Sequence, residues 1–208
     1  MITATRMRRI LSFIPVISLV LACTGPGHNT EESLKDKPSD MKQTTISAVA
    51  SRDEFKLIGQ DWMLITAGTK DSFNMMTASW GGFGILWNKK VATIYVRPSR
   101  YTHDFIENNE RLTLSFFPEE CRAALQLCGT RSGRDTDKLA LSGLTALELE
   151  SGAMTFTQAS LVLECRKLFK TEMEAVNFCD PEIFKEWYGT EDDAPHTIYI
   201  LEIEKVYE

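Results

Sequence analysis

The sequence predicts a mainly β fold, an antiparallel barrel with peripheral α-helices. Apolar and polar residues alternate in short segments, so that Leu112, Leu114 and Phe116 point one way while Thr113 and Ser115 point the other. A period of two is typical of half-buried antiparallel strands. No strand–helix–strand alternation runs through the chain, and many short strands with few inserted helices favour a barrel over a doubly wound sheet.

The same alternation predicts the other strands in order, at residues 62–69, 74–80, 91–96, 144–149, 161–173 and 199–203. Helices are predicted at residues 102–108, 118–127 and 181–188. The last helix has clear boundaries, with Asp180 as the N-cap, Pro181 in the first turn and Gly189 at the end. Residues 80–84 lack the G-x-G-x-x-G spacing, and no G-x-x-x-x-G-K-[ST] segment occurs, which argues against Rossmann and P-loop folds.

Residues 1–22 are expected to be a lipoprotein-type signal peptide. Three arginines precede an apolar run at residues 10–21 that is too short to span a bilayer comfortably. Ala22 and Cys23 resemble the lipobox of bacterial lipoproteins, in which the cysteine is acylated and becomes the mature N-terminus. We therefore expect lipidation of Cys23 and attachment to a membrane of the bacterial cell envelope, on the periplasmic side. The alternative is a cleaved signal peptide with an incidental cysteine.

Residues 23–55 are predicted to form a flexible tether, because they are rich in Thr, Gly, Pro, Ser, Asp and Lys and carry few apolar side chains. Residues 56–208 are predicted to form the folded unit. Its length of roughly 150 residues is enough for one domain with its own core.

Charge and cysteine spacing argue against two further classes of function. Loss of the three leader arginines from 23 basic residues leaves 20 against 29 acidic ones, a formal charge of −9, so nucleic-acid binding is not expected. The cysteines have no C-x-x-C spacing and the three histidines are scattered, so no metal site is expected. Cys121 and Cys128 lie seven residues apart on one predicted helix, about 10 Å, which is too far for a disulfide. We expect buried or free thiols.

Two segments place small hydroxyl residues and arginines beside a predicted helix start. The first is residues 74–80, Asn-Met-Met-Thr-Ala-Ser-Trp, and the second is residues 97–102, Arg-Pro-Ser-Arg-Tyr-Thr. If Thr102 caps the helix, the free N–H groups of its first turn, with Arg97 and Arg100, suit a phosphate monoester. The two segments therefore predict an anion site next to a flat, apolar-lined platform.

The order of these elements resembles the flavin reductase-like family, the FMN-binding split barrels that include the flavoredoxins. The resemblance covers about residues 61–207 and implies an antiparallel, Greek-key-like split β-barrel that binds FMN. An ordinary barrel strand with two core side chains is the alternative interpretation of the first segment. In the family this segment lines the isoalloxazine, which implies contacts from Met76, Thr77, Ala78, Ser79 and Trp80.

The second segment resembles the family's phosphate turn, and a third resembles another of its motifs. Residues 132–138 contain the pattern S-G-x-D-x-D-K, in which Lys138 approaches the FMN. Without the resemblance, the two segments would be a basic surface turn and a glycine-containing loop. The resemblance implies contacts with the phosphate, ribityl chain or ring of FMN from Arg97, Ser99, Arg100, Tyr101 and Thr102.

His196 precedes the last predicted strand, where relatives often carry a histidine near the flavin face. An imidazole there can contact a nicotinamide or shuttle a proton near the flavin N5, which makes His196 the candidate catalytic residue. A solvent-exposed histidine at a strand start is the alternative.

The resemblance implies an FMN-dependent oxidoreductase and a homodimer in which the second subunit completes the flavin site. Most relatives use NAD(P)H as co-substrate, but the predicted leader would export this protein to a compartment where these nucleotides are scarce. FMN would be held non-covalently, because no D-G-x-[ST]-G-[AS]-[TS] motif for covalent attachment is present. A lipid-anchored, flavoredoxin-like electron carrier with a membrane or protein donor therefore stays open, as does a cofactor-free binding lipoprotein.

Overall fold

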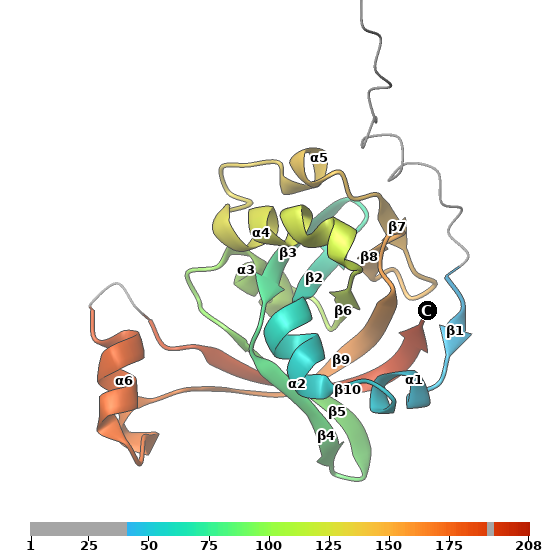
Figure 1. Cartoon of the computed structure of the whole chain (residues 1–208). Helices are drawn as coiled ribbons and strands as arrows, with labels where there is room; N and C mark the ends of the chain where they lie inside the picture. The colour runs from blue at the N-terminus through green and yellow to red at the C-terminus, as the bar shows by residue number, and fades with distance from the viewer. Residues whose placement is uncertain (1–40, 191–193) are drawn as a thin grey trace, which may run out of the picture.

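The structure is a computed structural model that describes residues 41–190 and 194–208 (Figure 1). In these residues one antiparallel sheet runs in the order β3-β2-β6-β9-β10-β5-β4, with β1 added to β10, and β7 and β8 form a separate pair. The predicted mainly β, antiparallel class is confirmed. The strands are β1 Gln43–Thr44, β2 Met63–Thr69, β3 Ser72–Ala78, β4 Gly81–Leu86, β5 Lys89–Val96, β6 Arg111–Phe116, β7 Ala146–Glu148, β8 Met154–Phe156, β9 Leu161–Glu172 and β10 Thr197–Tyr207.

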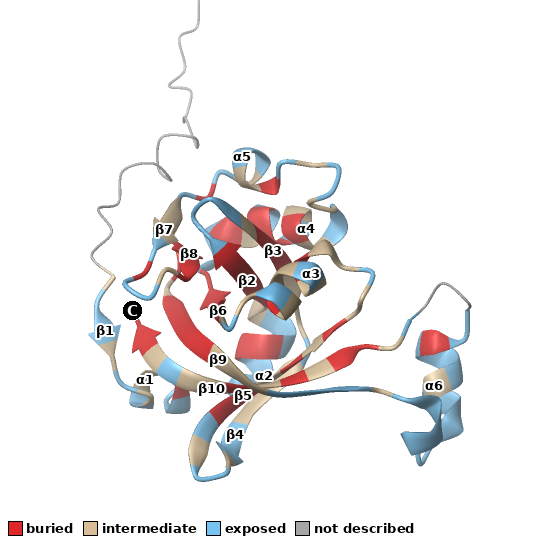
Figure 2. Cartoon of the chain, turned by 180° about the vertical axis from the view of Figure 1, so that it is seen from behind, coloured by how far each residue is buried: buried red, intermediate tan, exposed pale blue. Residues whose placement is uncertain are grey.

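The sheet curls around one apolar core, and a second apolar cluster lies on its other side (Figure 2). Ile65 and Leu163 are fully buried in the first core. Their chain neighbours Leu64 and Val162 are equally buried, in the second cluster. Because successive side chains of a strand point to opposite faces, β2 and β9 are covered on both sides at this level.

The helices cover one part of the sheet and bring two turns beside β3. α3 contacts β2 and β3, α4 contacts β3, and α5 contacts α4. None of the helices in the described residues is long and apolar enough to cross a membrane. The helices are α1 Ser47–Ala50, α2 Glu54–Lys56, α3 Tyr101–Asn108, α4 Arg122–Thr130, α5 Lys138–Ser142 and α6 Pro181–Tyr188, with a π-helical turn at Leu57–Asp61 and 3₁₀ turns at Glu119–Cys121 and Ala175–Asn177.

An arm that contains α6 interrupts the long β9–β10 hairpin. The hairpin pairs Glu172 with Thr197, and the chain between them projects to one side of the body (Figure 1). The Asp180 side chain accepts a hydrogen bond from the Glu182 N–H at 3.0 Å, and Pro181 begins the helix, as predicted. At the end of α6, Tyr188 shares a hydrogen bond with His196, the residue directly before β10.

Residues 41–55, which precede the boundary predicted at residue 56, already contact the sheet and the core. β1 pairs with β10, Val49 of α1 is buried in the first core, and Arg52 forms an ion pair with Glu208 at 2.8 Å. Composition suggested a tether for residues 41–55, but strand pairing and one buried valine fix this segment. Residues 1–40, including the predicted signal peptide and Cys23, lie outside the described residues.

The short elements β1, β4, β8, α1, α2 and α5 were not predicted, and one predicted cap is wrong. β4 carries three glycines and no clear alternation, and α5 is only one short turn, so neither gave a strong pattern. The helix predicted to start at Thr102 begins at Tyr101, with Arg100 as the N-cap residue and no side-chain cap. Thr102 is instead buried inside the first turn and accepts a hydrogen bond from Asn74 Nδ2 at 2.8 Å.

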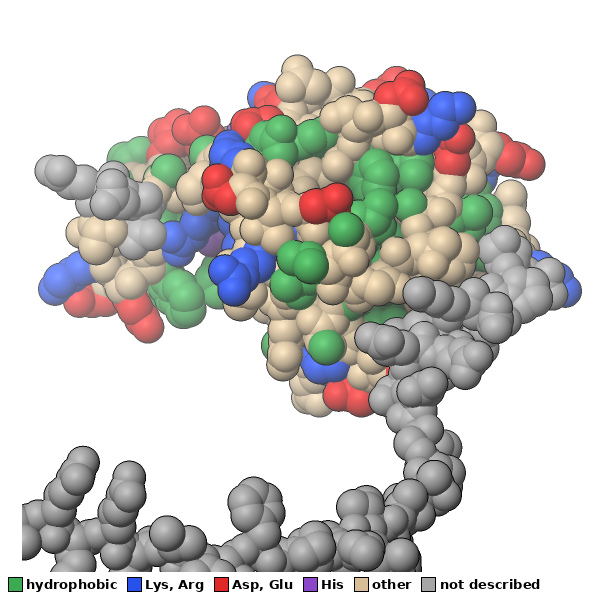
Figure 3. Space-filling model, turned by 90° about the horizontal axis from the view of Figure 1, so that it is seen from above, with side chains coloured by type: hydrophobic (Ala, Val, Ile, Leu, Met, Phe, Trp, Pro, Cys, Tyr) green, Lys and Arg blue, Asp and Glu red, His purple; other side chains and the backbone are tan. Residues whose placement is uncertain are grey.

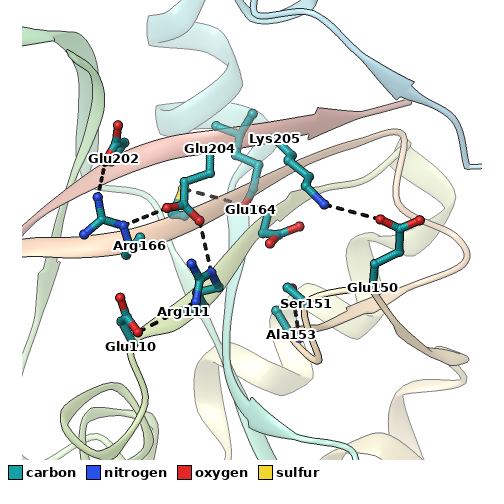
Figure 4. A network of polar contacts seen from close by, with 12 residues as sticks. Glu110, Arg111, Glu150, Ser151, Ala153, Glu164, Arg166, Glu202, Glu204 and Lys205 are labelled. Atoms are coloured by element: carbon teal, nitrogen blue, oxygen red, sulfur yellow. Dashed lines mark hydrogen bonds and ion pairs between the residues drawn. The ribbon is translucent and has the colours of Figure 1, made fainter. Parts of the chain in front are cut away.

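A polar network joins β6, β9 and β10 (Figure 4). Arg166 donates to Glu202 and, at 2.7 Å, to Glu204, and Arg111 donates to the second oxygen of Glu204 at 3.0 Å. These partly exposed ion pairs contribute little individually to stability. Because they cross three strands, they fix which side chains stand opposite one another.

Candidate functional site

The predicted site residues line two cavities that share one side chain. A cavity of about 210 Å³ lies along the end of β3, and a second of about 130 Å³ lies at the start of α3. Arg100 lines both. The first is lined by Met76, Thr77, Ala78, Ser79, Trp80, Tyr95, Arg97, Arg100 and His196, and the second by Ser99, Arg100, Tyr101, Thr102, Thr130, Arg131, Ser132, Gly133 and Lys138.

The end of β3 forms the floor of the first cavity, which we call the platform cavity. Met76 is buried in the first core, so the core interpretation of this side chain is also correct. The Thr77 hydroxyl donates to the Leu125 carbonyl at 2.5 Å and holds β3 against α4. Ser79 and Trp80 lie between β3 and β4, and Trp80 keeps an exposed ring face. The result is a flat, largely apolar surface.

Two cations meet in the second cavity, which we call the anion cavity. Arg100 donates to the carbonyls of Gly129 at 2.9 Å and Cys128 at 3.4 Å, and the Lys138 ammonium donates to the Met75 carbonyl. Neither cation forms an ion pair with a carboxylate in the described part of the chain. Lys138 is only 4% exposed. A buried and a half-buried cation without a counter-charge are costly, and a bound anion would compensate them.

The acid–base properties of the anion cavity agree with this geometry. Burial, together with the neighbouring Arg100 charge, lowers the pKa of Lys138 to about 8. Burial also raises the pKa of the Cys128 thiol to about 11, so this thiol is neutral at pH 7 and does not balance the two cations. A phosphate dianion here would favour the protonated lysine.

A loop that closes the anion cavity depends on one glycine. A Cβ atom on Gly133 would lie 2.2 Å from Asn74 Oδ1, so a larger residue cannot take this position without movement. Arg134 donates to the Ser99 carbonyl at 2.9 Å and stacks over the Tyr101 ring at 4.8 Å. Tyr101 is therefore held in place by the loop.

Residues 130–133 also line the anion cavity, although the sequence analysis selected only Lys138 from this loop. The S-G-x-D-x-D-K pattern includes Ser132 and Gly133, so the sequence did contain a signal for two of these four lining residues.

His196 is buried beside the platform, so the exposed-histidine alternative is wrong. It is 8% exposed, its Nδ1 shares a hydrogen bond with the Tyr188 hydroxyl at 2.7 Å, and its ring centroid lies 5.3 Å from that of Trp80. Burial, with the Arg97 charge, lowers the pKa of His196 to about 4. The imidazole is therefore neutral at pH 7, with one ring nitrogen that can donate a hydrogen bond and one that can accept a hydrogen bond.

The α6 arm contacts residues that line the platform cavity, a contribution that the sequence patterns did not predict. Arg97 donates to the Trp187 carbonyl at 3.0 Å, and the Trp187 ring packs edge-on against Trp80 at 5.0 Å. Lys and Arg side chains gather at the hollow between this arm and the body (Figure 3). Tyr95 was also missed, although it lies on β5 only two residues before Arg97, which follows the end of the strand and lines the same cavity.

The described residues contain no group of three or more His, Cys, Asp or Glu side chains placed to hold a metal ion. Cys121, Cys128 and Cys165 are buried thiols, and Cys179 is exposed. The chemistry available at the site is therefore that of an anion held at one end and a planar group held at the other, beside a neutral imidazole.

These features define an antiparallel β-sheet protein in which a largely apolar cavity adjoins a cavity that contains two cations. The chain belongs to the flavin reductase like domain family, whose family model matches residues 55–208. No curated protein sequence matches the chain at a significant level.

Solved structures share the fold at low sequence identity. Flavoredoxin from Methanosarcina acetivorans is 22% identical with a TM-score of 0.55, over 71% of this chain and 68% of that one. An FMN-binding domain of flavin reductases-like enzyme from Shewanella baltica OS155 is 15% identical with a TM-score of 0.57, over 81% and 76%. The NADH:FAD oxidoreductase of Streptomyces globisporus C-1027 is 16% identical with a TM-score of 0.51, over 70% and 74%.

Proposed function

We propose that the protein is an oxidoreductase that works through non-covalently bound FMN. The observation that carries this proposal is the pair of cations Arg100 and Lys138, which have no carboxylate partner among the described residues and lie at one end of two joined cavities. A phosphate monoester at that end and an isoalloxazine on the platform match the charge and the apolar surface respectively. Family membership and a flavoredoxin fold support the same assignment.

Each part of the site has a distinct role in this proposal. FMN supplies reversible two-electron chemistry when bound. Arg100 and Lys138 bind its phosphate, with hydrogen bonds from Ser99 and Thr102. The platform residues from Met76 to Trp80 exclude water from one face of the ring, and the buried neutral His196 exchanges a hydrogen bond or a proton at its edge.

NAD(P)H is one proposed electron donor, since one relative of this fold is an NADH:FAD oxidoreductase. The second candidate is a lipid-anchored electron carrier with a membrane or protein donor. The leader motif that ends at Cys23 favours it, because an exported protein would meet little NAD(P)H.

A homodimer is also proposed. Phe55, Trp80 and Trp187 are exposed aromatic side chains close to the site, and such patches mark interaction surfaces. Sedimentation of the FMN-loaded protein should give a dimer. A monomer that holds FMN fully would show that one subunit completes the site.

Titration calorimetry with FMN and riboflavin tests the cofactor assignment. FMN should bind much more tightly, and Arg100→Ala should cost about 1.5–3 kcal/mol of FMN binding, typical of a hydrogen bond between charged groups. Arg111→Ala is the matched control, because Arg111 pairs with Glu204 on the sheet and lines neither cavity. Equal affinity for riboflavin and FMN would contradict the phosphate assignment.

A further inference from the structure

A third cavity of about 550 Å³ adjoins the platform cavity and has no role so far. The two cavities share Ser79, Trp80 and Tyr95. The third cavity lies between the α2 region, β4 and the end of the α6 arm. A volume of this size accommodates a small organic molecule, and the shared walls would place that molecule next to a ring on the platform.

The walls of this cavity are mainly apolar, and five of the twelve described lining residues are aromatic. Phe55 is 91% exposed although it lines the cavity, so the described chain leaves its ring uncovered. Phe83, Tyr95 and Tyr188 add further rings. A Cβ atom on Gly82 would meet no atom within 4 Å, so the side facing this glycine is open space. Such walls suit a planar ring molecule, which aromatic side chains contact by stacking or edge-on packing.

The charge of the cavity selects against anions. Among the described residues that line it, Glu54 is the one charged residue and there is no Lys or Arg. Lys56 is paired with Asp61 at 2.6 Å. A dinucleotide pyrophosphate would find no cation here, whereas the hydroxyls of Ser79 and Tyr95 can donate hydrogen bonds to a neutral carbonyl oxygen.

We propose that this cavity binds a neutral, planar, two-ring quinone as the electron acceptor. The proposal rests on the proposed function, because the electrons come from reduced FMN on the other side of the Trp80 wall. In the reaction the two quinone carbonyl oxygens gain the two hydrogens and the electron pair that FMNH₂ loses, giving a hydroquinone and oxidised FMN. The cavity therefore distinguishes a lipophilic acceptor from a nucleotide.

Redox-inert probes test the cavity separately from the chemistry. Equilibrium dialysis should show 2-naphthol binding at least about tenfold more tightly than naphthalene-2-sulfonate, since no cation compensates the sulfonate. Phe55→Ala should weaken 2-naphthol binding by about tenfold through lost ring contact. Ile85→Ala, a similarly exposed side chain on β4 that does not line the cavity, should change nothing. Glu54→Lys should reduce the preference for the neutral probe.

The acceptor role is tested by single-turnover oxidation of photoreduced, FMN-loaded protein. In the wild type, the rate of reoxidation by 2-methyl-1,4-naphthoquinone should saturate as the quinone concentration rises. In Phe55→Ala, the rate at low quinone concentration should be lower, with the thermal melting temperature unchanged. Equal binding of the two probes, or unchanged binding in Phe55→Ala, would overturn the proposal. The proposal would also be overturned if the wild type were a dimer that binds neither probe and Phe55→Ala were a monomer. That result would mean that a second copy of the chain covers Phe55.

The failure of each proposal is distinguishable. If 2-naphthol binds but FMN does not, the proposed function fails, the acceptor role is overturned with it, and only the neutral-ring cavity remains. If FMN binds but 2-naphthol does not, the cavity is wrong and the FMN site stands.

Discussion

At the scale of single residues, the charge of Lys138 in the anion cavity should make the affinity for a phosphate depend on pH. With no ligand its pKa is about 8. A phosphate dianion favours the charged lysine and raises that pKa, so binding takes up a proton above pH 8. FMN affinity should therefore be constant near pH 7 and fall as the pH rises above 8, by up to about tenfold per pH unit.

Calorimetry from pH 6.5 to 9.5 checks this expectation, with riboflavin as the control for ionisation of the ring. Lys138→Met should bind FMN more weakly at pH 7 and lose the decline above pH 8. An unchanged decline in the variant would assign the pH dependence to another group.

His196 separates a catalyst from a carrier. His196→Ala should slow reduction of the bound flavin by NAD(P)H by roughly 10²-fold, with FMN affinity nearly unchanged, if the imidazole assists the transfer. Because its pKa is about 4, His196 stays neutral from pH 5 to 8 and should produce no step in the rate there. Stopped-flow absorbance under anaerobic conditions measures the rate. If the protein is a carrier, a protein donor should reduce the flavin equally fast in the wild type and in His196→Ala. Loss of FMN from the variant would instead show that His196 binds the cofactor.

At the scale of elements, the loop before α5 is fixed to β3 by one close approach. Gly133→Ala would place a methyl group 2.2 Å from Asn74 Oδ1, so the loop must move and the anion cavity must open. We expect a loss of about 1–3 kcal/mol in the free energy of unfolding and weaker FMN binding. Denaturant unfolding and calorimetry check both. Gly84→Ala on β4 is the control, since its Cβ would meet no atom within 4 Å, and equal stability of the two variants would contradict the account.

Sequence patterns predicted elements well where a local signal was strong. Alternation located β2, β5, β6, β9 and β10, and the Asp180–Pro181–Gly189 pattern located α6. The glycines of β4 concealed that strand, because they carry no side chain to alternate. The Thr102 cap failed because a buried hydrogen bond from Asn74, distant in sequence, uses its hydroxyl.

The candidate site shows the same limit at the scale of the whole molecule. All twelve selected side chains line the joined cavities, because the motifs lie at the ends of neighbouring elements. The contribution of Trp187 and Tyr188 could not be predicted, because an arm inserted between β9 and β10 returns them to the site only through tertiary packing. Residues 41–55 were assigned to a tether because their contacts with β10 and the first core are distant in sequence.

At the scale of the whole molecule, the proposed membrane attachment depends on Cys23, which precedes every residue of the candidate site in the sequence. If Cys23 carries lipid, Cys23→Ser should move the protein from the membrane fraction to the soluble fraction. Two or more acyl chains anchor a protein firmly to a membrane, whereas a protein without acyl chains keeps only weak contacts with its surface. The flavin spectrum should not change, because the proposed site is built from residues 76–196. Fractionation of cells that produce each form, with mass spectrometry of the mature N-terminus, measures both. Membrane partition that is the same in the two forms would show that Cys23 is an incidental residue of a cleaved leader.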